Sequence, residues 1–261
     1  MTRARDLAKG TFSGDLTVDT NTLVVDSANN RVGVGTASPV NKVTVNGGVS
    51  ILPYYETYLV NSYYSGGWKY AGNGHAWGIG NNFNGPANGV TIGIAPVNAG
   101  GAGAALTWNP AFNIDSAGAV TMPYQPAFLA RPASAQLNLP AGGSTLILFG
   151  SVSYDQNADF ASSVFTAPVT GKYYLDVSLR IDNIDTAASY YELKLLTSNR
   201  TYYNLQRFNG MSEDPSYWNM QSSAVADMDA GDTASIVMNI PNGTSQADVS
   251  TESHFCGYLV C

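Results

Sequence analysis

Charged side chains are scarce in this chain of 261 residues. Asp, Glu, Lys and Arg make up 12% of the sequence, against about 25% in an average soluble domain. The net charge is −7, and the 12 basic residues are scattered, apart from one group at Arg3, Arg5 and Lys9. A phosphate backbone is bound by clustered basic side chains, so this scatter argues against nucleic acid as a partner. The aromatic content of 11% excludes a disordered chain, because disorder goes with few aromatic residues and a high net charge.

Long apolar runs and cysteines are also scarce. No run approaches the roughly 20 apolar residues of a membrane-spanning helix, so we expect no membrane insertion. Residues 1–7 lack the apolar core of a secretory signal, which predicts synthesis and folding in a cytoplasm. Cys256 and Cys261 lie an odd number of positions apart, so on one strand they would point to opposite faces. We expect two unpaired thiols, with a bridge between subunits as the alternative.

Histidine is limited to His75 and His254, which lie in different segments. A histidine metal cluster or a Ser-His-Asp triad would need partners that the sequence does not place. His254 precedes the last predicted strand, where a structural role is expected. Glycoside cleavage needs paired carboxylates, and two pairs are candidates by residue type alone: Glu213 with Asp214, and Asp155 with Asp159. Nothing in their sequence setting predicts a raised pKa, so we predict no catalytic residue and no enzyme.

Alternating apolar and polar residues dominate what is present. Between Gly171 and Asp182, every second residue is apolar: Tyr173, Leu175, Val177, Leu179 and Ile181. This period predicts a strand with one buried face. Similar runs occur at 190–196, 234–240 and 255–260, with turn residues between them. The sequence therefore predicts an all-β protein with an antiparallel sandwich in its C-terminal part.

Two runs near the start carry a family resemblance. They are Gly14–Leu23, GDLTVDTNTL, and Asn30–Pro39, NRVGVGTASP. Both resemble a module found near the start of many bacteriophage tail and head fibre proteins, with Val34 where Ile is frequent. The resemblance implies a small intertwined trimeric β shaft over residues 13–50. Residues 1–12 would then be an anchor to other virion proteins. An ordinary hairpin is the alternative for Gly33 and Gly35, but it leaves the longer match unexplained.

A region rich in glycine and aromatic residues follows over residues 51–123. It ends on residues 112–120, which echo residues 25–32 with a turn that is one residue shorter. We expect a second hairpin of the same kind there. Pro123 and Pro126 mark the boundary to the last predicted domain, residues 124–261.

Aromatic residues and glycines of the C-terminal part fall at fixed intervals. The pattern comprises Phe149, Asp155, Phe160, Phe165, Gly171, Tyr173, Leu175, Gly231, Asp232, Phe255 and Gly257. It resembles the C1q globular-head family, which is similar to tumour necrosis factor. The resemblance implies a jelly-roll sandwich that assembles as a homotrimer, with these residues building the core and the subunit contact. The gap between Phe160 and Phe165 is two residues shorter than usual, which predicts a trimmed strand or loop.

Candidate binding residues lie outside this pattern, in the run 198–220, which we expect to be rich in loops. Six of them form a candidate receptor site: Arg200, Tyr202, Tyr203, Arg207, Tyr217 and Trp218. Tyrosine and tryptophan offer rigid contact area with polar tips, which suits a surface glycan. Packing at the sandwich edge or between subunits is the alternative.

A partial calcium loop is a further candidate: Asp227, Asp229 and Asp232, beside Gly231. Calcium is bound by several oxygen ligands, but the downstream bidentate glutamate is missing. A solvated turn is the alternative, and no other cofactor is expected.

Together these features predict a bacteriophage fibre protein of the virion, on the head or the tail. Its trimeric C-terminal knob would bind a bacterial surface component, a glycan or a protein receptor. One alternative is a structural virion decoration or tail-tip protein that does not bind the host. The other is a surface polysaccharide depolymerase.

Overall fold

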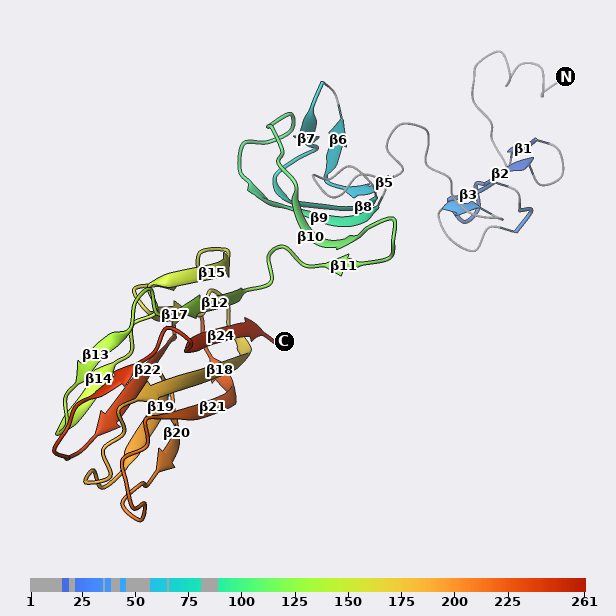
Figure 1. Ribbon diagram of the computed structural model, residues 1–261. Helices are drawn as coiled ribbons and strands as arrows, with labels where there is room; N and C mark the ends of the chain where they lie inside the picture. Colours follow the sequence, from blue (N-terminus) through green and yellow to red (C-terminus); the bar gives the residue numbers. More distant parts are fainter. Residues whose placement is uncertain are drawn as a thin grey trace, which may run out of the picture. The chain divides into compact units, whose positions relative to one another are not determined.

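The computed structural model describes residues 16–18, 22–34, 36–38, 43–45, 57–64, 66–80 and 89–261. All secondary-structure elements named in these ranges are β-strands, which confirms the all-β prediction (Figure 1). The same ranges hold no helix long and apolar enough to cross a membrane. The predicted anchor, residues 1–12, lies outside the described residues.

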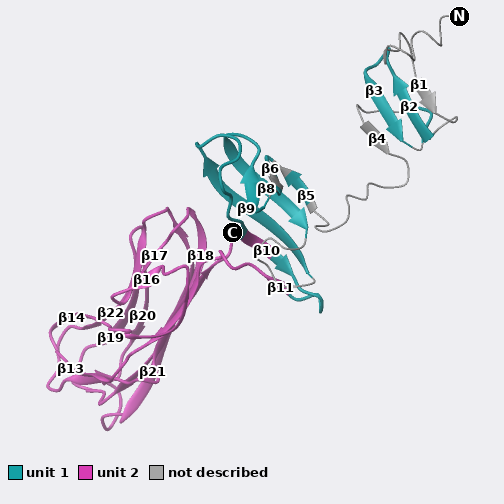
Figure 2. Cartoon of the chain, turned by 90° about the horizontal axis from the view of Figure 1, so that it is seen from above, with its two compact units in different colours: residues 1–109, 113–119 teal, residues 110–112, 120–261 magenta. Residues whose placement is uncertain are grey.

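Contacts divide the chain into two compact units (Figure 2). The first comprises Met1–Asn109 and Asn113–Ala119, and the second comprises Pro110–Phe112 and Val120–Cys261. Each unit has a hydrophobic core of its own.

The first sheet of unit 1 has four strands in sequence order: β1 (Leu16–Val18), β2 (Leu23–Asp26), β3 (Arg31–Val34) and β4 (Val43–Val45). A turn over residues 27–30 joins β2 to β3, and Asn30 adopts a positive φ of 54° there. The Asp26 carboxylate accepts the backbone N–H of Asn29 at 3.0 Å, which closes the turn. Strand β4 pairs with β3 in parallel. The intertwined trimeric shaft stays a prediction.

A second sheet, whose strands β5, β8 and β9 belong to unit 1, has the order β11 (Val120–Thr121), β10 (Asn109–Ile114), β9 (Val90–Asn98), β8 (Gly74–Gly80) and β5 (Thr57–Val60). A separate ribbon pairs β6 (Ser62–Tyr64) with β7 (Trp68–Tyr70). Tyr70 and Trp108 are the largest side chains of a small core. The predicted hairpin at 112–120 corresponds to β10 and β11, and the Asp115 carboxylate accepts backbone N–H groups within its turn.

Unit 2 is a sandwich of two antiparallel sheets. The seven-stranded sheet has the order β13 (Gln136–Leu139), β23 (Ala247–Val249), β18 (Gly171–Asp182), β24 (His254–Leu259), β12 (Ala127–Arg131) and β15 (Ser151–Gln156), with β21 (Tyr217–Met228) also paired to β18. The six-stranded sheet has the order β16 (Phe160–Ala161), β17 (Val164–Thr166), β22 (Thr233–Ile240), β19 (Tyr191–Thr197) and β20 (Thr201–Gln206), with β14 (Gly143–Leu146) also paired to β22. This architecture is the predicted jelly-roll sandwich.

The core of unit 2 lies on the predicted face of β18. Its five alternating apolar residues are all fully buried: Tyr173, Leu175, Val177, Leu179 and Ile181. The Phe128 ring stacks on those of Phe160 and Phe165, with centroids 4.8 Å apart in both pairs. Such ring pairs add to the stabilisation from burial.

The short interval between Phe160 and Phe165 is a tight hairpin. Phe160 pairs with Phe165, and the two turn residues Ser162 and Ser163 have φ values of 52° and 66°. Positive φ at both central residues is typical of the two-residue turns that match strand twist. The Ser163 hydroxyl also accepts the backbone N–H of Phe149 at 2.8 Å. The trimmed segment therefore keeps both phenylalanines in the core.

Candidate recognition surface

Several residues of the C-terminal pattern have structural roles, in turns or in the packing of the core. The Asp155 carboxylate accepts the backbone N–H groups of Asp159 at 2.9 Å and Phe160 at 3.1 Å, which shapes the turn after β15. Gly257 faces the core, where an added Cβ would lie 2.6 Å from Leu175 Cδ2. Gly171 is equally confined, because an added Cβ would lie 2.7 Å from the carbonyl oxygen of Cys261. These positions are therefore explained by turns and packing.

Strands occupy 10 of the 23 residues of the run 198–220, and the other 13 lie in loops, so the predicted run is loop-rich but contains parts of two strands. Strand β20 occupies residues 201–206 and β21 begins at Tyr217, so the connecting loop is confined to residues 207–216. The polar residues of β20 are tolerated because it is the last strand of its sheet. The Asn204 side-chain amide donates to the carbonyl oxygen of Gln221 at 2.8 Å and links β20 to β21.

The six candidate receptor residues do not form one patch. Tyr203 is 65% exposed and points away from the core, whereas Tyr202 is half-buried and packs against it. Arg200 lies before β20 and forms an ion pair with Asp227 at 3.3 Å. The remaining three lie beside the loop that connects the two strands. Arg207 directly follows the last residue of β20, and Tyr217 and Trp218 are the first two residues of β21.

We call residues 207–218 the 207–218 surface. Tyr217 is 58% and Trp218 38% exposed. The Trp218 ring packs edge-on against the buried Phe208, with centroids 5.3 Å apart. The loop itself is held by its carbonyl groups, since Ser216 and Pro215 accept the backbone N–H groups of Asn183 and Ile184. The aromatic side chains are therefore presented from a fixed backbone.

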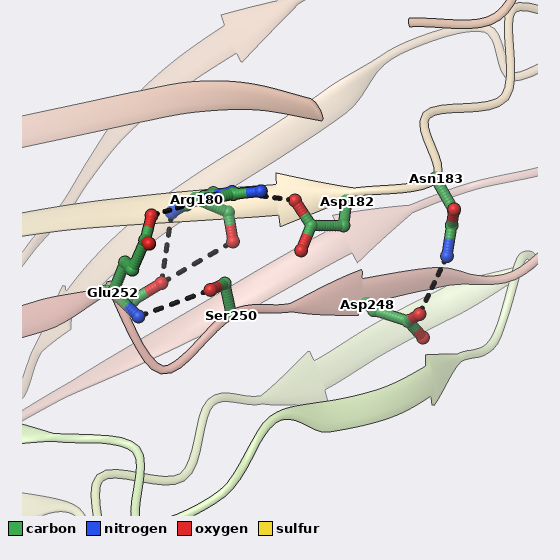
Figure 3. Close-up of polar contacts among 7 residues, drawn as sticks. Arg180, Asp182, Asn183, Asp248, Ser250 and Glu252 are labelled. Atoms are coloured by element: carbon green, nitrogen blue, oxygen red, sulfur yellow. Dashed lines mark hydrogen bonds and ion pairs between the residues drawn. The ribbon is translucent and has the colours of Figure 1, made fainter. Parts of the chain in front are cut away.

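A charged cluster supports Tyr217 from β18. Arg180 donates to Asp182 at 2.9 Å and to Glu252 at 2.6 Å (Figure 3). The guanidinium carbon of Arg180 lies 4.8 Å from the centroid of the Tyr217 ring. This cation–π contact positions the exposed ring. Beside it, Asn183 donates to Asp248 at 2.8 Å.

A hollow of about 630 Å³ lies within the same loop and is lined by residues 210–216. Its lining includes Glu213 and Asp214, one of the carboxylate pairs considered from the sequence. Asp214 accepts the backbone N–H of Thr186 at 2.8 Å and the hydroxyl of that residue at 2.6 Å, which fixes its orientation. The lining of the hollow contains no aromatic residue and is largely polar.

The other carboxylate pair has one perturbed member, contrary to the sequence analysis. Burial raises the pKa of Asp159, and the charge of Asp155 raises it further. Both Asp155 oxygens, however, accept backbone N–H groups within the turn. The pair is therefore engaged in shaping the turn after β15.

The candidate calcium residues are held by separate partners. One Asp232 oxygen accepts both the backbone N–H of Asp229 and the amide of Asn199, each at 2.8 Å. Asp227 is paired with Arg200. Asp229 accepts from the Thr170 hydroxyl at 3.5 Å. This arrangement is that of a hydrogen-bonded turn before β22.

A different group, which the sequence analysis missed, does converge. Asp176, His254 and Cys256 place possible ligand atoms within 4.8 Å of one another, the one such group of three among the described residues. Burial raises the pKa of the Cys256 thiol, and Asp176 adds to this. Cys256 and Cys261 are both free, and Cys261 lies beyond β24 rather than on it. The signal for this group was the two-residue spacing of His254 and Cys256, which places them on one strand face.

The sandwich and its pairing define a C1q-like class of β-domain. The C1q domain family model matches residues 127–260, just over half of the chain. The protein therefore belongs to the C1q domain family.

Solved structures give more distant similarities. The globular domain of zebrafish complement 1qA is 18% identical, with a TM-score of 0.37, and the match covers 52% of this chain and 98% of that one. Murine APRIL at pH 8.5 is 12% identical, with a TM-score of 0.37 and the same coverage. No curated protein matches the chain.

Proposed function

We propose that this protein is a bacteriophage fibre protein of the virion whose C-terminal unit, as a homotrimer, binds a bacterial surface glycan. The fibre assignment is supported by the resemblance of residues 14–23 and 30–39 to the phage fibre module. The binding role is supported by membership of the C1q family and by the 207–218 surface. Its exposed Tyr217 and Trp218 directly follow, in sequence, the loop residues 210–216 that line a polar hollow, and that observation carries the proposal.

The chemistry of this surface suits a sugar better than an apolar ligand. Aromatic faces stack on sugar rings, while the hydroxyl, carboxylate and backbone groups of residues 210–216 supply hydrogen bonds. Arg207, which is exposed directly after β20, adds a positive charge to the 207–218 surface, which is suitable for an acidic sugar. The residues have no arrangement that we assign to bond cleavage, so the proposed role is attachment.

Replacing Trp218 or Tyr217 by alanine is expected to weaken glycan binding about tenfold each, since exposed aromatics dominate such contacts. The full-length protein is tested by biolayer interferometry against a panel of purified bacterial capsular and O-antigen polysaccharides. Tyr203→Ala is the matched control, because Tyr203 is more exposed but lies outside the 207–218 surface. An equal loss in Tyr203→Ala, or no binding of any bacterial polysaccharide by the wild type, would contradict the proposed site.

The homotrimer gives a second expectation. Domains of the C1q family commonly form homotrimers. Multi-angle light scattering of the full-length protein should give a mass three times the 27.5 kDa of one chain. A stable monomer at micromolar concentration would contradict trimeric assembly and the fibre assignment with it.

A further inference from the structure

Three side chains of different chemistry meet on the outer face of the seven-stranded sheet. Asp176 on β18 lies directly opposite Cys256 on β24, and the next outward pair joins Ser178 to His254. Directly opposite residues have Cβ atoms about 5 Å apart, and residues two apart on a strand share a face. The neighbouring residues Leu175, Val177 and Phe255 point into the core instead. The register therefore brings Asp176, His254 and Cys256 together.

The group is compact and partly shielded from solvent. His254 Nε2 lies 3.6 Å from Asp176 Oδ2, and all three candidate ligand atoms lie within 4.8 Å of one another. Asp176 is 7% exposed, and the side chain of His254 retains 33% exposure. The carboxylate of the cluster is thus buried, whereas its imidazole is partly exposed to solvent.

The carboxylate has a fixed orientation. Gln221 on the adjacent strand β21 donates its side-chain amide to Asp176 Oδ1 at 3.1 Å. This bond leaves Oδ2, the oxygen nearest His254, directed at the other two side chains. Outer hydrogen bonds of this kind orient the ligands of metal sites.

We propose that Asp176, His254 and Cys256 form a binding site for a zinc-like divalent cation. A thiolate, an imidazole and a carboxylate are the ligand types that zinc takes in proteins, commonly at four-coordinate sites. Calcium and magnesium take oxygen ligands almost exclusively, so the sulfur and nitrogen donors select against them. Three protein ligands leave one position for water or an incoming ligand. This site is separate from the 207–218 surface and does not depend on the proposed fibre function.

Cobalt(II) titration of the full-length, tag-free protein under a thiol-free reductant tests the site. The expected result is one cobalt ion per chain, with a thiolate-to-cobalt absorption band in the near ultraviolet that zinc abolishes by displacement. Cys256→Ser should lose the band, and His254→Ala should weaken cobalt binding at least about tenfold, since each removes one ligand.

The chain supplies matched controls, because it has only two cysteines and two histidines. Cys261→Ser and His75→Ala should bind cobalt as the wild type does. His254 is partly exposed, so His254→Ala is expected to fold, and its circular dichroism and melting temperature are checked first. Absence of the thiolate band from the wild type, or its persistence in Cys256→Ser, would overturn the site. Loss of the band in Cys261→Ser but not in Cys256→Ser would also overturn the site, because the cobalt-binding thiolate would then be Cys261.

Discussion

Replacing Asp185 by alanine is expected to lower the stability of unit 2 by about 3 kcal/mol or more. Asp185 is 2% exposed and lies between β18 and β19. One carboxylate oxygen accepts the backbone N–H groups of Thr244 and Ser245, and the other accepts that of Ala187 at 2.8 Å. Alanine would leave these N–H groups without their acceptor, and each unsatisfied buried donor costs about 1–3 kcal/mol.

The stabilisation by Asp185 should also depend on pH. Burial opposes ionisation of Asp185, but the N–H donors of Ser245, Thr244 and Ala187 outweigh it and lower the pKa of the carboxyl group. A lowered folded-state pKa means that the charged form stabilises the fold fully above the unfolded pKa of about 3.9. That stabilisation is lost as the pH falls through the lower, folded-state value. The stability difference between wild type and Asp185→Asn should therefore be constant near neutrality and shrink below about pH 4.

Thermal unfolding of the full-length protein, followed by near-ultraviolet circular dichroism from pH 7 downwards, measures both effects. Asp229→Asn is the control, because Asp229 is exposed and its side chain accepts a long hydrogen bond of 3.5 Å from the Thr170 hydroxyl. It should change the melting temperature little at any pH. A wild-type-like melting temperature for Asp185→Ala would show that the carboxylate does not stabilise this junction. A pH-independent difference for Asp185→Asn would contradict the stabilising role of its charge.

The sandwich was predictable because its strands alternate strongly. In β18, five apolar residues at period two correspond to five fully buried side chains. The turn between β2 and β3 was predictable for a similar local reason, since Asn30 tolerates the positive φ that the turn requires. The interval between Phe160 and Phe165 is short in the sequence itself, but its conversion into a two-residue turn depends on cross-strand pairing.

The recognition surface was only partly predictable. The aromatic residues were found from composition, but alternation along β20 sends Tyr203 outward and Tyr202 inward, while Trp218 packs on Phe208. Which of these side chains contact one another depends on how the edge strands β20 and β21 are connected, and that geometry could not be predicted from the sequence. The Asp176, His254 and Cys256 group needed the register of β18 against β24, because Asp176 lies far from the other two in sequence.

Replacing Gly257 by alanine is expected to destabilise unit 2 by about 2–3 kcal/mol, through overpacking rather than loss of a contact. Gly257 is buried on β24, between the two core residues Leu175 and Phe128. An added Cβ would lie 2.6 Å from Leu175 Cδ2, 2.9 Å from Phe128 Cε1 and 3.0 Å from the carbonyl oxygen of Tyr174. The last of these is backbone of the paired strand, so the strain cannot be relieved by rotating one side chain.

Chemical denaturation of Gly257→Ala and a double mutant tests this mechanism. Leu175→Val removes the Cδ atoms nearest the new methyl group, so the double mutant should be more stable than the sum of the two single effects by about 1 kcal/mol. Gly143→Ala is the control, because an added Cβ there has no heavy atom within 4 Å, and it should leave the midpoint almost unchanged. Strict additivity of Gly257→Ala and Leu175→Val would show that the cost arises elsewhere. The glycine of the C-terminal pattern would then be required for the backbone of β24 and not for the space beside Leu175.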